Sequence, residues 1–175
     1  MSTGTVVTPL RTEYAAVAGG LSARPLRTGR SRGFGGMPPA GPVLIAGVAG
    51  GLTADVHPRD RVVATAVGRE GALEPCPAAP LVAGTLRRAG LTVHLGPVVT
   101  TERIVDDPAE RARLAATGAI AVDTETALLV DQVAAGRAVV VRAIVDTPGH
   151  RLLHPGTPRR GLAALASLRK AAPVP

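Results

Sequence analysis

The chain has 175 residues, of which 46% are hydrophobic, and 20 basic against 13 acidic residues give it a formal net charge of +7. This length predicts a single domain over residues 1–175 that buries its own core. The sequence has neither an apolar run that would span a membrane nor a signal-peptide pattern, so we expect a cytoplasmic protein without stable membrane insertion. The single cysteine, Cys76, can form no internal disulfide, which fits a reducing compartment.

The positive charge does not by itself indicate a nucleic-acid partner. Every basic residue except Lys170 is arginine, and the arginines are scattered apart from one cluster, Arg24, Arg27, Arg30 and Arg32. One Tyr, one Phe and no Trp leave the chain without the aromatic platform of single-strand binders. We therefore expect no nucleic-acid partner, and the abundance of Ala, Gly, Pro and Arg is typical of a GC-biased coding sequence.

The first predicted unit is a strand that runs into a helix. Residues 5–8 form a β-rich run, and apolar residues then recur at helical spacing over residues 10–21. Glu13 falls in the first turn of that helix, where it either faces a pocket or complements the helix dipole.

A loop is predicted over residues 22–41, because glycine and proline break every periodicity there. Its basic segment around Gly29 and Arg30 has backbone amides and guanidinium groups that would suit an anion. The alternative is a flexible surface linker.

After this loop, the sequence predicts a buried strand over Val43–Ala46, followed by small residues up to Gly51. Glycine at such a place lets another group approach the backbone closely. The spacing matches neither the dinucleotide-binding fingerprint nor the phosphate loop. The next strand is expected over residues 61–65.

A polar, proline-rich stretch over residues 68–80 leads to a helix over 81–89 and a strand over 91–100. A well-defined helix follows. Asp106 or Asp107 is expected to cap it, Pro108 lies in its first turn, and Gly118 follows its end.

The segment Gly118–Val130 is the first candidate site. Ala119–Val122 suit a buried strand, and Asp123 and Glu125 follow where that strand stops and a helix over 124–135 begins. Open α/β sheets bind ligands at the carboxyl ends of their strands. The alternative is that Asp123 is only an N-cap and Glu125 only a charge favoured by the helix dipole.

The strongest predicted strand covers residues 138–145 and ends on Asp146. Arg142 within it is costly unless it is paired. We expect its partner to be Glu13, Glu125 or Asp146.

A loop over 152–158 and a helix over 160–171 close the chain. Strands and helices therefore alternate, which predicts an α/β domain with a largely parallel sheet. Four candidate site residues follow directly on predicted strands: Glu13, Gly50, Glu125 and Asp146. Their shared placement favours an enzyme.

Three strings, in this order along the chain, resemble the signature regions of the nucleoside phosphorylase and nucleosidase superfamily. They are Gly47–Leu52 with Asp60–Thr65 behind it, Val122–Ala127, and Val141–Asp146, and Pro9–Glu13 matches the first strand-to-helix turn. The resemblance covers nearly the whole chain. Within the superfamily the sequence is most similar to the bacterial hopanoid-associated branch, which acts on adenosylhopane.

The resemblance implies a three-layer α/β fold around a central, mostly parallel mixed sheet. It implies cleavage of the N-glycosidic bond of a purine nucleoside with a modified 5′ group, releasing adenine, by a homodimer or higher homo-oligomer. Methylthioadenosine/S-adenosylhomocysteine nucleosidase and futalosine hydrolase are the alternatives within the superfamily. A non-catalytic descendant that binds a nucleoside or a partner protein is the alternative from another class.

Carried over residue by residue, the resemblance implies that Asp146 donates a proton to purine N7. Glu125 would hold the ribose hydroxyls, and Glu13 would be the general base on water, with Arg142 helping to hold that water. The base and sugar would contact Ala49, Gly50, Ile104, Val105, Thr124, Glu125 and Arg142. A phosphate or water site would involve Gly29, Arg30, Val48 and Arg142.

No metal and no organic cofactor are implied, because the four histidines show no ligand spacing. Phosphate is a possible co-substrate. Val48 stands where several relatives have a serine on the nucleophile, and Glu13 would repel phosphate, so both favour hydrolysis. The basic loop around Arg30 favours phosphorolysis, and on that loop we expect phosphorolysis rather than hydrolysis.

Overall fold

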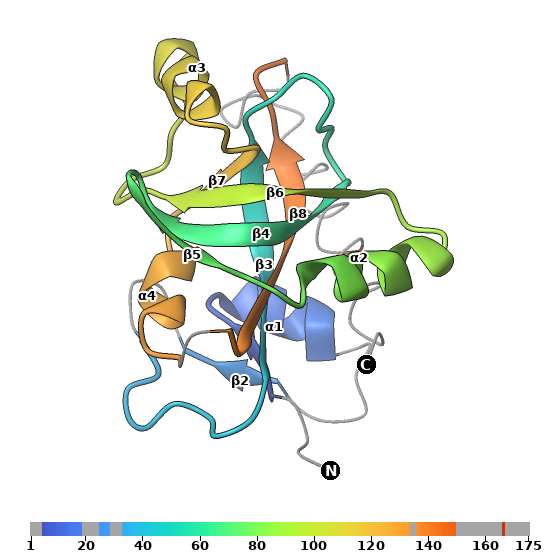
Figure 1. Cartoon of the computed structure of the whole chain (residues 1–175), viewed down its shortest axis with the longest axis vertical. Helices are drawn as coiled ribbons and strands as arrows, with labels where there is room; N and C mark the ends of the chain where they lie inside the picture. Colours follow the sequence, from blue (N-terminus) through green and yellow to red (C-terminus); the bar gives the residue numbers. More distant parts are fainter. Residues whose placement is uncertain (1–4, 19–24, 29–32, 134–135, 150–165, 167–175) are drawn as a thin grey trace.

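The computed structural model describes residues 5–18, 25–28, 33–133, 136–149 and 166. Within these residues the chain forms one mixed sheet with helices packed around it (Figure 1). The strands are β1 (Thr5–Thr8), β2 (Leu26–Arg27), β3 (Val43–Gly51), β4 (Arg61–Arg69), β5 (Ala72–Pro75), β6 (Val93–Thr100), β7 (Ala121–Asp123) and β8 (Ala138–Asp146). The helices are α1 (Arg11–Ala18), α2 (Ala79–Arg88), α3 (Pro108–Ala116) and α4 (Thr126–Val130).

The sheet has the order β2-β1-β3-β7-β6-β4-β5, and β8 pairs with both β3 and β4. Strands β3, β8, β4, β6 and β7 therefore pair in a closed ring, with β1 and β2 extending it beside β3. Pairing is antiparallel for β3 with β7 and for β4 with β5 and β8, and parallel elsewhere. The prediction of an α/β fold with a mostly parallel mixed sheet is confirmed.

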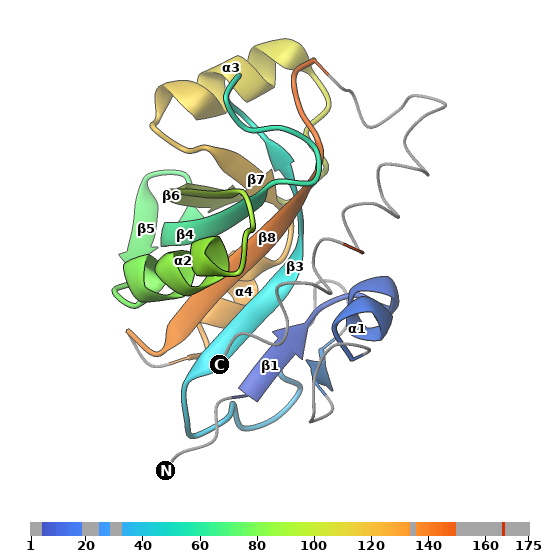
Figure 2. The same ribbon diagram turned by 90° about the vertical axis from the view of Figure 1, so that its right-hand side faces the viewer.

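Helices lie on both sides of the central strands. Figure 2 shows α1 on one side of β3 and β8 and α2 on the other, with α3 at one end of the sheet. Among the described helices, none has the length and apolar character needed to cross a membrane.

The core is built from short branched side chains, as expected for strands covered on both faces. Most of β8 is buried, and its neighbour β3 is buried along most of its length. Fully buried members of this core include Val7, Ile45, Val63, Val140 and Ile144.

The predicted start and end of α3 are confirmed. The carboxylate of Asp107 accepts hydrogen bonds from the backbone N–H groups of Ala109 and Glu110, each at 3.3 Å, and Pro108 occupies the first turn. Gly118 follows the helix with φ of +89°, a conformation that glycine adopts without strain.

Several predicted boundaries are wrong. The strand expected over Val43–Ala46 runs on to Gly51, because β8 and β7 both pair with its glycine-rich end, and Gly50 therefore lies within β3. The polar, proline-rich stretch over 68–80, where no strand was predicted, contains β5, which turns back on β4 through Gly71 at φ of +81°. The helix expected over 124–135 is the shorter α4. The basic loop around Gly29 and most of the closing helix over 160–171 lie outside the described residues.

Candidate active site

A cavity of about 220 Å³ lies where β1, β3, β6, β7 and β8 end. Its wall includes the residues predicted for the base and sugar except Arg142: Ala49, Gly50, Ile104, Val105, Thr124 and Glu125. Val48, predicted for the phosphate or water site, and Asp146, predicted as the catalytic acid, also line it. Asp123 and Val122, from the first candidate segment, line it too. The wall also includes residues that the sequence did not single out: Leu10, Thr101, Arg103, Arg111 and Val145. The cavity therefore lies at the ends of strands, where ligands bind in open α/β sheets.

Arg142, in the middle of β8, is fully buried and forms an ion pair with Asp123. Arg142 Nη2 lies 2.8 Å from Asp123 Oδ2, and Arg142 Nε donates to Thr126 Oγ1 at 3.1 Å. Asp123 Oδ1 accepts further hydrogen bonds from Thr100 Oγ1 at 2.8 Å and from the Thr126 N–H at 3.2 Å. The expected partner of Arg142 was Glu13, Glu125 or Asp146, and the ion pair with Asp123 corrects that expectation.

Glu13 lies one layer behind the cavity wall. Its side chain is fully buried, and its carboxylate accepts hydrogen bonds from the backbone N–H of Leu10 at 2.9 Å and of Val48 at 2.8 Å. Burial raises the pKa of Glu13 above its ordinary value of 4.5, against the opposing effect of the positive charge of Arg142. Neither Glu13 nor Arg142 belongs to the cavity wall. Each instead contacts residues that do: Glu13 binds Leu10 and Val48, and Arg142 binds Asp123.

Gly47 explains how a carboxylate and a guanidinium fit beside the backbone of β3. A Cβ atom at this position would overlap Arg142 Nη1 and would lie 2.8 Å from Glu13 Oε1. Only glycine leaves room for both groups, so the close approach expected from the glycine string does occur. The approaching groups come from the protein itself.

Asp146 ends β8 on the cavity wall and forms an ion pair with Arg111 of α3. Arg111 is 3% exposed, donates from Nε to the Val105 carbonyl at 3.1 Å and from Nη1 to the Gly51 carbonyl at 3.0 Å, and reaches Asp146 Oδ2 through Nη2. Its guanidinium is therefore fixed in position. Gly50 gives both groups space, since a Cβ there would lie 3.3 Å from Arg111 Nη2 and from each carboxylate oxygen of Asp146.

The two acidic residues after β7 have different roles. Asp123 Oδ1 accepts from the backbone N–H groups of Glu125 and Thr126, at 3.3 and 3.2 Å, and so satisfies the start of α4 as a capping residue does. Glu125 occupies the N-cap position but makes no capping bond with its side chain, which is buried at the cavity wall. Asp123 therefore does cap α4, as the alternative expected, and it pairs with Arg142 as well.

Among the cavity residues that the sequence analysis missed, Arg111 is the one paired with a predicted catalytic residue. It shares the buried face of α3 with Leu114, three residues further on, and a charge on the buried face of a helix requires a partner. The helical spacing of Arg111 and Leu114 was the signal in the sequence that Arg111 is buried. Its partner Asp146 lies 35 residues away in the chain, and only the fold brings the two together. Gly29 and Arg30, expected at a phosphate or water site, lie outside the described residues.

In the described part of the chain, metal-ligating side chains do not cluster, and the one cysteine is buried. No group of three or more histidine, cysteine or acidic side chains is placed there to hold a metal ion. Cys76 is buried, and burial raises the pKa of its thiol to about 11, which leaves it a poor nucleophile at neutral pH.

Residues 40–159 match the family description "Phosphorylase superfamily". Because this match covers more than half of the chain, the protein belongs to the phosphorylase superfamily. No curated protein matches the sequence.

Solved structures of similar fold come from nucleosidases and a related hydrolase. The chain is similar to 5′-methylthioadenosine/S-adenosylhomocysteine nucleosidase of Campylobacter jejuni, with a TM-score of 0.74 and 13% identity over 99% of each chain. A futalosine hydrolase mutant of Helicobacter pylori gives a TM-score of 0.73 and 14% identity over 99% of this chain and 96% of that one. An aspartate-to-asparagine mutant of the H. pylori nucleosidase with 5′-methylthioadenosine in its active site gives 0.71 and 13% over 99% and 96%.

Proposed function

We propose that this protein is a nucleosidase-type enzyme that cleaves the N-glycosidic bond of a purine nucleoside. The observation that carries the proposal is the meeting of three buried carboxylates, Asp123, Glu125 and Asp146, at one cavity. Buried carboxylates cost stability, and they concentrate where chemistry needs them. Membership of the phosphorylase superfamily and the nucleosidase names of the similar structures support the same reaction class.

The arrangement suits the charge that develops as a glycosidic bond breaks. The sugar becomes positively charged and oxocarbenium-like, while the base leaves with negative charge. Glu125 is the group we assign to the ribose hydroxyls and the developing positive charge. The ion pair of Asp146 and Arg111 is the group we assign to the leaving base, since it combines an acceptor and a donor at the end of β8.

Water is the nucleophile that the described residues support best. The backbone N–H groups of Leu10 and Val48, both at the cavity wall, are bound by the carboxylate of Glu13, where a phosphate ion would need donors. A water molecule that takes over one of these contacts would be hydrogen-bonded to Glu13, the general base in this proposal. The earlier preference for phosphorolysis depended on the loop around Arg30, of which the structure describes nothing.

An apolar 5′ group fits the wall of the cavity. Leu10, Ile104 and Val105 line it, and Ile104 is 52% exposed, which leaves apolar surface for a ligand. Adenosylhopane, the substrate suggested by the resemblance, has such a group, and so does methylthioadenosine, from which the similar nucleosidases take their name. Futalosine is the third candidate, because a futalosine hydrolase is among the similar structures.

The test is release of free base from a panel of nucleosides: adenosine, methylthioadenosine, futalosine and an adenosylated lipid. We expect base release that depends on Asp146, with Asp146→Asn as the inactive control, and faster release from the nucleosides with apolar 5′ groups. The similar H. pylori mutant holds 5′-methylthioadenosine in its active site, so we expect Asp146→Asn to bind a good substrate without cleaving it. Tight binding without release by the wild-type protein would instead support a non-catalytic descendant of the fold.

A further inference from the structure

Arg103 is a charged residue of the cavity wall that lies in the loop between β6 and α3. This loop is anchored at both ends. The backbone N–H of Thr101 donates to the Asp123 carbonyl at 2.9 Å, and the Val105 carbonyl accepts from Arg111 Nε at 3.1 Å. The Thr101 hydroxyl also donates to the Arg103 carbonyl at 2.8 Å. The backbone that carries Arg103 is therefore held against the cavity.

The side chain of Arg103 differs in exposure from Arg111, the other basic residue of the wall. Arg111 is closed inside a buried pair with Asp146, in which each side chain is 4% exposed. Arg103 Nη2 pairs with Glu110 Oε2 at 2.9 Å, but 72% of the Arg103 side chain faces water. An exposed pair of this kind contributes only about 0–1 kcal/mol. A ligand anion can therefore share Arg103 with Glu110, or replace Glu110, at little cost.

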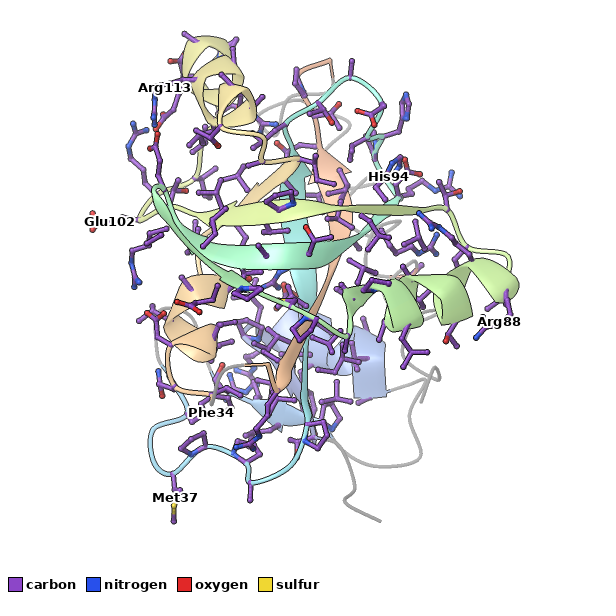
Figure 3. The ribbon with its side chains drawn as sticks, viewed as in Figure 1. Phe34, Met37, Arg88, His94, Glu102 and Arg113 are labelled. Atoms are coloured by element: carbon purple, nitrogen blue, oxygen red, sulfur yellow. The ribbon has the colours of Figure 1, made fainter. Side chains whose placement is uncertain are left out.

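The guanidinium of Arg103 has the capacity for such a ligand. Within the described part of the chain it bonds to Glu110 alone. A guanidinium has five N–H groups, and the bond to Glu110 uses one of them. The neighbouring acid, Glu102, lies on the outside of the molecule (Figure 3). A carboxylate matches the fork of guanidinium N–H groups through two parallel hydrogen bonds.

We propose that Arg103 binds a carboxylate at the end of the 5′ substituent, so that the preferred substrate carries an acid on an apolar 5′ arm. This inference rests on the proposed cleavage of a purine nucleoside, and it adds the chemistry of the 5′ end. Ile104, the next residue along the loop, is 52% exposed at the cavity wall and offers apolar surface to the arm. An arm that packs on Ile104 brings its end to Arg103.

The charges of the cavity wall favour a singly charged group over a phosphate. The basic members are Arg103 and Arg111, and the acidic members are Asp123, Glu125 and Asp146. Two positive and three negative formal charges sum to −1. A phosphate dianion would bring twice the charge of a carboxylate to a wall that is already negative. A carboxylate and one guanidinium instead form a neutral pair.

The test is calorimetric binding of two carbocyclic adenosine analogues, one with a 5′-propylthio group and one with a 5′-(2-carboxyethylthio) group. The two arms have the same length and differ only in the methyl or carboxylate at the end. Carbocyclic analogues lack the ring oxygen that stabilises the oxocarbenium-like state, so binding is measured without cleavage.

The variants are Arg103→Met, Arg103→Lys and, as a matched control, Arg113→Met. Arg113 is also an exposed arginine in a surface pair, since its side chain is 54% exposed and pairs with Glu70. Figure 3 shows Arg113 on the outside of the molecule. Arg113 does not line the cavity.

We expect the wild-type protein and Arg113→Met to bind the carboxylate analogue at least about 10-fold more tightly than the propyl analogue at low ionic strength. Added salt should lower this ratio, because the exposed charge of Arg103 is screened. Arg103→Met should bring the ratio to one or below, since the remaining charges of the wall are mostly acidic. Arg103→Lys should keep part of the ratio, because it retains the charge without the fork.

Equal binding of the two analogues by the wild-type protein would overturn the role of Arg103 and leave the proposed function standing. A ratio that Arg103→Met retains, or that added salt does not change, would overturn that role as well. Binding of neither analogue would contradict the nucleoside site itself, and with it the proposed function. The salt series needs only the wild-type protein, so it decides even if a variant does not fold.

Discussion

Arg142 and Asp123 form an ion pair at 2.8 Å in which both side chains are withdrawn from water, with 0% and 2% of their side-chain surface exposed. They come from β8 and β7, strands that are not paired with each other, and Thr126 bonds to both. Asp123 lines the cavity and caps α4, so the pair connects both to β8. Removal of either partner would leave the other as an uncompensated buried charge.

We predict that Arg142→Met lowers the free energy of unfolding by about 3–5 kcal/mol. Adding Asp123→Asn should recover part of that loss, because the double variant no longer buries a lone charge. Urea unfolding of the wild-type protein, both single variants and the double variant measures this directly. Strictly additive losses in the double variant would show that the pair contributes no coupling.

Gly47 is predicted to be essential because the space of its missing side chain is filled by Arg142 and Glu13. Gly47→Ala should therefore lower both stability and base release, the latter by at least about 10-fold, as the two charged groups are displaced from their partners. Gly36→Ala is the matched control, since a Cβ there meets no atom within 4 Å. The control should stay within about 0.5 kcal/mol of the wild-type stability. Equal behaviour of the two variants would contradict the geometry at Gly47.

Glu13 gives the reaction a dependence on pH. A general base acts in its ionised form, and burial raises the pKa of Glu13 above 4.5, so kcat/KM should fall on the acid side at a higher pH than an ordinary glutamate would give. Glu13→Gln should lose about 10²–10⁴-fold in kcat and lose this acid limb. A profile of kcat/KM against pH for both proteins tests this. An unchanged limb in Glu13→Gln assigns it to another group.

Glu125 is predicted to act on the sugar. Glu125→Gln should lower kcat/KM by about 100-fold through the loss of charge-assisted hydrogen bonds to the ribose hydroxyls. The same variant should cost clearly less with a 2′-deoxynucleoside, in which one of those hydroxyls is absent. Glu102→Gln is the control, because Glu102 is exposed and lies on the outside of the molecule (Figure 3). An equal cost with both sugars would exclude the assignment of the 2′-hydroxyl to Glu125.

The sequence predicted the elements of the fold better than their ends. Branched apolar runs identified β3 and β8, and Asp107 with Pro108 identified the start of α3, because these signals are local. The closure of β3, β8, β4, β6 and β7 into a ring depends on pairing between distant segments, which no local pattern encodes.

Candidate site residues were predicted to the extent that they follow strands. Glu125 and Asp146 were found in this way, and both line the cavity. The ion-pair partners of the acidic residues were not predicted. Asp146 pairs with Arg111 and Asp123 with Arg142 because of how α3, β7 and β8 pack together.

The measurement that tests the proposed reaction most directly is release of base from a cleavable purine nucleoside in phosphate-free buffer, with and without added phosphate, with the sugar product identified. Because Glu13 occupies the backbone donors of Leu10 and Val48, we predict full activity without phosphate and a free sugar as the product. Base release that requires phosphate and yields ribose 1-phosphate would contradict the account and restore the phosphorylase assignment.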